Sequence, residues 1–191
     1  MQTQQPILEV VCDEWDHELK ATRMIVRSIY PLIFTPENLQ KFWDKAKQFP
    51  TLYGKEILSN PQEFFSILMS EEVDGSIVPN GLFWVIDDFV GVFYINEIDV
   101  INREAHVHYT FFDKRTNGRI KLVKEMMKYV FLKYNFQRLN APIPLYTSPI
   151  TRKFCLDLGF YYEGKKRDAA FYKGQWFSVN LYGILRKEVL K

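Results

Sequence analysis

The chain has few cysteines, little net charge and no long apolar run. Its 191 residues include two cysteines, Cys12 and Cys155, and no C-x-x-C pair, so we expect neither a zinc ribbon nor a disulfide framework. The formal net charge of +2 argues against a dedicated electrostatic nucleic-acid binder. The longest apolar stretches have the length of a strand and fall far short of a membrane span.

Common signature motifs are missing as well. The sequence contains no G-x-x-x-x-G-K-[ST], G-x-G-x-x-G or G-x-S-x-G motif, which disfavours a P-loop, a Rossmann nucleotide site and a serine-hydrolase site. The opening residues have neither a basic start nor an apolar run, so we expect no secretory signal and a reducing, cytoplasmic setting. No Gly/Ser linker or repeat divides the chain. We therefore expect a single domain over residues 1–191, with an irregular N-terminal segment at 1–22.

What the chain does have is a large supply of apolar side chains in regular patterns. Its 16 Phe, 11 Tyr and 4 Trp residues can build a substantial core. A cap residue followed by proline predicts helices at 36–49 and 61–71, and apolar spacing predicts two more at 122–131 and 149–158. Alternating and β-branched runs predict strands at 25–29, 82–86, 89–95, 105–112, 138–142, 161–172 and 177–185. This order predicts a mixed α/β or α+β domain.

The segment that leads from the strand at 105–112 into the helix at 122–131 is the most informative part of the sequence. A helix N-terminus carries unpaired N–H groups and partial positive charge, which suits a phosphate or pyrophosphate. Here Gly118 permits close backbone approach, and Arg115 and Arg119 add positive charge. An ordinary strand-to-helix turn with solvated cations explains the same residues.

Two histidines, His106 and His108, share one face of the strand at 105–112. Such a pair could chelate a metal ion or supply a general base. Because no third ligand is apparent, we predict no metal site and favour the general base.

Three segments carry a resemblance to a known family. Residues 91–99 with 102–109 are similar to a pair of central strands with the pattern G-x-x-x-(L/I)-x-x-I-D and N-R-x-A-x-I-G-Y. Residues 148–164 are similar to N-x-x-S-x-x-(V/A)-L-x-x-x-G-F-x-x-E-G, and residues 167–188 to a closing hairpin. Together they resemble the GCN-five-related N-acetyltransferases (GNAT), in particular the RimJ/RimL-like branch, over more than half of the chain.

This resemblance implies a GNAT-like α/β (α+β) fold with a central mixed, mostly antiparallel sheet and helices on both faces. It implies that acetyl-CoA lies between splayed central strands and that the amine of the acceptor attacks the thioester directly. The early helices, at 36–49 and 61–71, are expected to shape the acceptor cleft. The residues that the resemblance assigns to binding acetyl-CoA are Tyr109, Phe111, Phe112, Arg115, Asn117, Gly118, Arg119, Ile120, Ser148 and Thr151.

The implied reaction needs a base for the amine and a proton donor for the departing thiolate. Relatives often place the base on the strand that here carries Glu104, His106 and His108, and His106 is our first choice. Thr151 is the nearer family match for the donor, and Cys155 is a weaker one.

The sequence also departs from the family pattern. The phosphate loop at 115–120 is degenerate, Ser148 stands where the family usually has Asn, and Cys155 stands where many members outside this branch have a general-acid Tyr. In its amphipathic helix, Cys155 is expected to be a buried, inert thiol. These departures keep open a non-catalytic module that uses the same fold for assembly or interaction.

The partners implied by the resemblance are acetyl-CoA and an amine acceptor, which is either a protein N-terminus or a small amine. We expect no membrane and no metal, and we leave a homodimer open. A third alternative is an acetyltransferase that acts on a nucleic-acid-linked amine through the basic residues at 114, 115, 119, 121, 152, 153, 165, 166 and 167. The near-neutral total charge makes a nucleic-acid partner the weaker interpretation.

Overall fold

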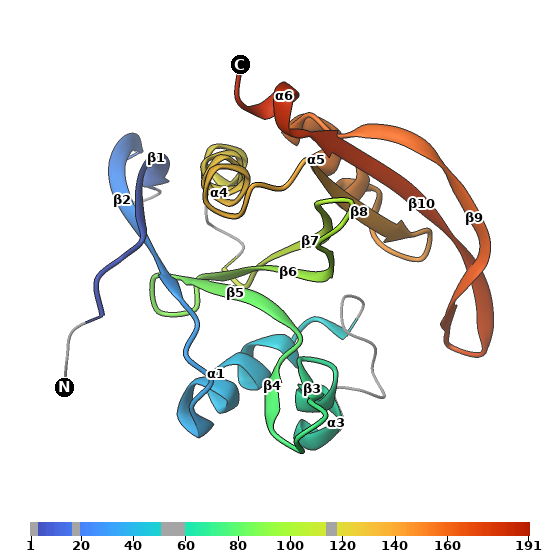
Figure 1. Ribbon diagram of the computed structural model, residues 1–191. Helices are drawn as coiled ribbons and strands as arrows, with labels where there is room; N and C mark the ends of the chain where they lie inside the picture. The colour runs from blue at the N-terminus through green and yellow to red at the C-terminus, as the bar shows by residue number, and fades with distance from the viewer. Residues whose placement is uncertain (1–3, 17–19, 51–59, 114–117) are drawn as a thin grey trace.

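The computed structural model describes residues 4–16, 20–50, 60–113 and 118–191. They form one large sheet of eight strands, a two-stranded sheet and five helices, which Figure 1 labels. The strands of the large sheet are β1 (Leu8–Asp16), β2 (Ala21–Pro31), β5 (Gly81–Ile86), β6 (Gly91–Asp99), β7 (Glu104–Phe111), β8 (Arg138–Pro144), β9 (Tyr161–Tyr172) and β10 (Gln175–Leu185). The remaining elements are α1 (Pro36–Ala46), α3 (Pro61–Ser66), β3 (Met69–Glu71), β4 (Ile77–Pro79), α4 (Arg119–Tyr134), α5 (Pro149–Leu158) and α6 (Arg186–Val189).

The large sheet has the strand order β1-β2-β5-β6-β7-β8-β10-β9. Every neighbouring pair is antiparallel except β7 and β8, which run parallel. A parallel pair needs a crossover connection, and α4 supplies it. The predicted mixed, mostly antiparallel sheet is therefore confirmed.

Helices cover both faces of this sheet (Figure 1), as the sequence predicts. On one face α4 and α5 pack over the strands and close the larger core. On the other face α1 and α3 close a smaller core that is rich in phenylalanine; its ring pairs include Phe42 with Phe64 and Phe42 with Phe112. The strands β5 and β6 contribute side chains to both cores and lie between them.

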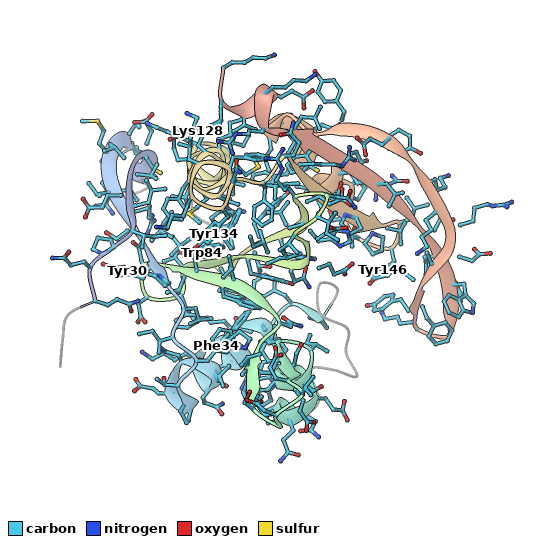
Figure 2. The ribbon with its side chains drawn as sticks, viewed as in Figure 1. Tyr30, Phe34, Trp84, Lys128, Tyr134 and Tyr146 are labelled. Carbon is cyan, nitrogen blue, oxygen red and sulfur yellow. The ribbon has the colours of Figure 1, made fainter. Side chains whose placement is uncertain are left out.

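The helix α4 is the main element of the larger core. Its apolar stripe is fully buried, whereas Lys128 lies off the stripe and is paired with Glu125. At its C-terminal end Tyr134 packs edge-on against Trp84 of β5, with ring centroids 6.0 Å apart (Figure 2). The residues of the stripe are the six expected from spacing: Leu122, Val123, Met126, Met127, Val130 and Phe131.

Two expectations from sequence are wrong. The segment 1–22 is not irregular throughout, because β1 pairs with β2 along its whole length and turns Val10 and Cys12 into the core under α4. The helix expected at 61–71 ends at Ser66, because residues 69–71 pair as β3 with β4.

Candidate functional site

The central strands β7 and β8 separate after a short stretch of pairing. They pair at three positions only, from Glu104–Arg138 to His106–Asn140. Beyond this point β7 continues to pair with β6 as far as Phe111, and β8 continues to pair with β10 as far as Pro144. A gap therefore opens in the sheet between residues 107–111 of β7 and residues 141–144 of β8.

Two prolines explain why the pairing stops. N–H groups alternate in direction along a strand. Arg138 donates its N–H to Arg103 just before β7, whereas Leu145 donates to Ser178 of the other neighbour, β10. By this alternation Pro142 and Pro144 occupy the positions whose N–H groups would face β7, and proline has no N–H to donate. The sequence of β8 thus removes the bonds that would close the gap.

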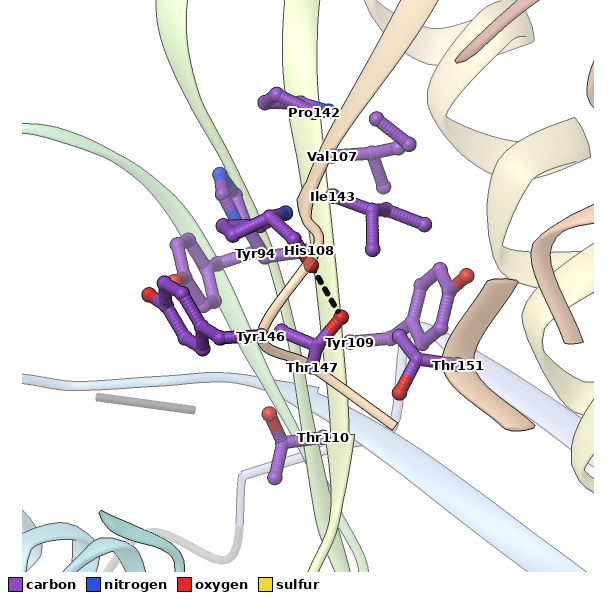
Figure 3. A pocket seen from close by; sticks show the side chains of 12 residues that line it. Tyr94, Val107, His108, Tyr109, Thr110, Pro142, Ile143, Tyr146, Thr147 and Thr151 are labelled. Carbon is purple, nitrogen blue, oxygen red and sulfur yellow. Dashed lines mark hydrogen bonds between the residues drawn. The ribbon is translucent and has the colours of Figure 1, made fainter. Parts of the chain in front are cut away.

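A groove runs along the gap and continues past it. The cavity in the gap has a volume of about 130 Å³, and its wall includes His108 and Tyr146 (Figure 3). A second cavity of about 180 Å³ lies between the beginnings of α4 and α5. Tyr109, Thr110 and Thr151 line both cavities, so the two are parts of one groove.

The far end of the groove is the N-terminus of α4. Gly118 is the N-cap residue, with a left-handed φ of 71°, and it offers no side chain to cap the first N–H groups of the helix. Arg119 lines the second cavity, where its guanidinium lies 5.2 Å from the centre of the Phe111 ring and donates to the carbonyl oxygen of Asp113. This end of the groove therefore combines the first N–H groups of a helix with a fixed cation, which is the chemistry that binds a phosphate.

The structure brings some of the predicted acetyl-CoA residues to the groove and places others elsewhere. Tyr109, Phe111, Arg119 and Thr151 line it, and Gly118 lies at its end. The side chain of Phe112 is buried in the smaller core, that of Ile120 packs on the larger core, and the hydroxyl of Ser148 caps α5 by accepting from the N–H of Ile150. Arg115 and Asn117 lie outside the described residues.

Cys155 is buried behind the groove. It is fully inaccessible and next to the hydroxyl of Tyr109, and burial raises the pKa of its thiol to about 12. Burial also raises the pKa of Tyr109 well above its usual value. The predicted buried thiol is confirmed, and it lines neither cavity of the groove.

Glu104 and His106 lie in a different cavity, of about 400 Å³, on the face of the sheet away from α4. The carboxylate of Glu104 is 3.7 Å from the guanidinium of Arg138, which is also paired with Glu163. Nδ1 of His106 is 3.2 Å from a carboxylate oxygen of Glu97. This polar cavity and the groove share Pro142 in their walls, so they are neighbours across β8.

His108 is the histidine that faces the groove. Its ring stacks on Tyr94 with centroids 4.4 Å apart, and Nε2 is 2.9 Å from Oδ1 of Asn96. Burial, with a smaller contribution from His106, lowers the pKa of His108 to about 4, so its imidazole is neutral near pH 7. The alternation of the strand indicated that both histidines share a face, but it could not tell which of them borders the gap.

Over the part of the chain that the structure describes, no three His, Cys, Asp or Glu side chains gather closely enough to hold a metal ion. Within the same residues, no helix has the length and apolarity needed to cross a membrane.

A sheet opened between two parallel central strands, with a helix N-terminus at the end of the gap, offers a strand edge and an anion site to an extended ligand. The sequence profile of the acetyltransferase (GNAT) domain family matches residues 82–181. No curated protein sequence matches the chain. Solved structures do, and they share the fold.

Three of these structures show the range of acceptors for which the matched enzymes are named. A spermidine N-acetyltransferase chimera based on the Vibrio cholerae enzyme is 17% identical, with a TM-score of 0.69, covering 86% of this chain and 98% of that one. The Vibrio cholerae spermidine N-acetyltransferase in complex with CoA and spermine is 17% identical, with a TM-score of 0.65, covering 86% and 98%. The ribosomal-protein-S5-alanine acetyltransferase from Vibrio fischeri is 13% identical, with a TM-score of 0.63, covering 85% and 94%.

The chain belongs to the GNAT acetyltransferase family, because the family profile spans more than half of it. It is therefore an enzyme that transfers the acetyl group of acetyl-CoA to an amine. The predicted family, fold and cofactor are confirmed, and the acceptor and the roles of single residues are taken up below.

Proposed function

We propose that the groove between β7 and β8 holds acetyl-CoA and that the polar cavity beside it admits a primary amine, either a protein N-terminus or a small amine. The observation that carries this proposal is the gap itself. The pairing of β7 with β8 ends at His106–Asn140 while β7 runs on to Phe111, and an extended chain of amides fits a strand edge of this kind. When bound, acetyl-CoA supplies a thioester whose carbonyl carbon an amine can attack.

The N-terminus of α4 is the proposed site for the pyrophosphate. Arg119 is already held over Phe111 and against Asp113, so a phosphate would meet a preordered cation beside the first N–H groups of the helix. Charge-assisted bonds of this kind contribute about 1.5–3 kcal/mol each.

Two side chains carry the proposed proton transfers. Thr151 lines both parts of the groove and is the proposed donor to the departing thiolate. His106, paired with Glu97 in the polar cavity, is the proposed base that removes the proton of the amine through solvent. Glu104 is the second candidate for the base, although its ion pair with Arg138 favours a supporting role.

The acceptor and the setting remain proposals. Matched structures include enzymes named for spermidine, which is a small amine, and for an alanine of ribosomal protein S5. Two free, buried cysteines fit a reducing compartment, and we propose a cytoplasmic enzyme without a nucleic-acid partner. One matched enzyme is dodecameric, and the homodimer expected here is still a prediction.

Calorimetric titration with acetyl-CoA tests the proposal, with the Arg119→Glu variant and a Lys128→Glu control. Both variants reverse one charge on α4, but Lys128 lies outside the groove. We expect the wild type and the control to bind alike, and Arg119→Glu to bind at least about tenfold more weakly.

The same titration gives the outcomes that would overturn the proposal. Wild-type protein that gives no heat and no thermal upshift at millimolar ligand does not hold acetyl-CoA in this groove. Binding without turnover on peptides and on polyamines would instead identify the non-catalytic module.

A further inference from the structure

A stack of three aromatic rings reaches one wall of the gap, where Tyr94 and His108 line the cavity. Phe83 of β5, Tyr94 of β6 and His108 of β7 lie on the same face of three adjacent strands. The Phe83 and Tyr94 rings are 5.0 Å apart at 13°, and the Tyr94 and His108 rings are 4.4 Å apart at 8°. A ring held this way has one orientation at the cavity.

The hydrogen bond to Asn96 fixes which nitrogen of His108 carries its proton. An amide oxygen only accepts, so the contact of 2.9 Å from Nε2 to Oδ1 of Asn96 places the hydrogen on Nε2. Nδ1 then keeps a lone pair. No described residue bonds to Nδ1, and His108 borders the gap. The ring lines the cavity, and a hydrogen on Nε2 leaves Nδ1 as its acceptor.

We propose that His108 orients the acceptor amine by accepting one of its hydrogens at Nδ1, so that the nitrogen lone pair points at the acetyl carbonyl. This inference rests on the proposed function, and it assigns a separate task from that of His106. As the carbon–nitrogen bond forms and the carbon–sulfur bond breaks, the thiolate leaves with the electron pair. The proton of the amine then goes through solvent to His106 and does not stay on His108.

The charge state of His108 supports this division of work. Burial lowers its pKa to about 4, which makes it a weak base but leaves it a hydrogen-bond acceptor throughout the physiological pH range. The titratable groups around it are His106 on its own strand, with Glu97 beyond, and three tyrosines in the wall of the cavity: Tyr94, Tyr109 and Tyr146. Among the described residues, no carboxylate lines the cavity to favour the imidazolium.

Two substitutions at position 108 test separately the hydrogen-bond acceptor Nδ1 and the stacking of the aromatic ring. His108→Phe keeps a stacked ring and removes Nδ1, whereas His108→Asn keeps an acceptor close to the position of Nδ1 and loses the stack. We expect His108→Phe to lower kcat about tenfold to hundredfold with an unchanged Kd for acetyl-CoA. We expect His108→Asn to recover most of that loss.

The Asn96→Asp variant tests the role of His108 through the pH dependence of activity, which would not change if His108 only supported the fold. A carboxylate at Oδ1 favours the imidazolium, so the pKa of His108 rises, and below it both nitrogens are donors. Activity should then fall as the pH drops through the raised pKa. The wild type should show no such loss from His108 above about pH 5, since its pKa is about 4.

Nitrogen-15 NMR of the imidazole rings in wild-type protein tests the same idea without turnover. We expect a neutral His108 with its proton on Nε2 down to about pH 5. A proton on Nδ1, or a His108→Phe variant with wild-type kcat, would overturn the inference. Because these results are obtained with protein that binds acetyl-CoA, they are distinct from a failure of the groove to bind it at all.

Discussion

Replacing Gly118 with alanine tests how closely β1 supports the beginning of α4. Gly118 has a φ of 71°, and a Cβ built on it would lie 2.8 Å from Cβ of Cys12 on β1. A left-handed non-glycine residue costs about 1–2 kcal/mol, and forcing an extra methyl group into a packed core costs about 1–3 kcal/mol. We therefore expect Gly118→Ala to lower the free energy of unfolding by about 2–5 kcal/mol.

Urea unfolding followed by circular dichroism measures this loss, and Gly174→Ala is the matched control. Gly174 has a φ of 76°, but a Cβ there meets nothing within 4 Å, so only the backbone cost applies. Adding Cys12→Gly to Gly118→Ala removes Cβ of Cys12, the atom that the new methyl group would meet. This second substitution should recover the extra loss of stability that Gly118→Ala shows over Gly174→Ala. Cys12→Ala, which keeps Cβ, should not recover it. If Gly118→Ala costs no more than Gly174→Ala, the close approach of β1 to α4 is refuted. The affinity for acetyl-CoA should also fall in Gly118→Ala, because the displaced backbone belongs to the end of the groove.

Two further predictions concern buried polar groups. Burial raises the pKa of Cys12, and it raises the pKa of Cys155 to about 12, so both thiols are protonated at pH 8. We expect both to react with a disulfide reagent only after denaturant is added. Rapid labelling of the native protein would contradict this burial. Asp87 accepts hydrogen bonds from the side chain of Arg27, at 2.7 Å, and from the N–H of Ser28, at 2.8 Å. We expect Asp87→Ala to cost about 2–3 kcal/mol in urea unfolding and Asp87→Asn clearly less; equal losses would show that these bonds contribute little.

Most elements beyond residue 80 could be predicted because their signals are local. Helix α5 begins after the cap Ser148 and ends at Gly159, whose φ of 104° only glycine adopts easily. The six-residue apolar stripe of α4 follows directly from a period of 3.6. Such features depend on neighbours along the chain, so the sequence alone specifies them.

Features that depend on distant partners could not be predicted in this way. The strand β1 forms because Val10 and Cys12 find a place under α4, more than 100 residues away. Asp87 lies in the turn after β5, and it bonds to Arg27 and Ser28 of β2, which are about 60 residues away in sequence. The separation of His106 and His108 into two cavities depends on Tyr94 and Arg138, which lie on other strands.

The pair of prolines in β8 was the signal that sequence reasoning missed. Pro142 and Pro144 alternate with Ala141 and Ile143, so the strand can be complete on one side and open on the other. A proline at every second position of a central strand could have indicated in advance where the sheet opens.

The short contact between β7 and β8 also makes the sheet mechanically uneven. Two well-paired blocks, β1 to β7 and β8 to β10, share a seam of only three residue pairs, with α4 and α5 bridging it from one side. A ligand lying along the seam would bond to one block and contact the other, so it would stabilise the short contact between β7 and β8. The melting temperature of the protein and the protection of the amides of residues 107–111 from hydrogen exchange should therefore both rise when the groove is occupied. We expect these two quantities to report occupancy more sensitively than any change in the overall shape.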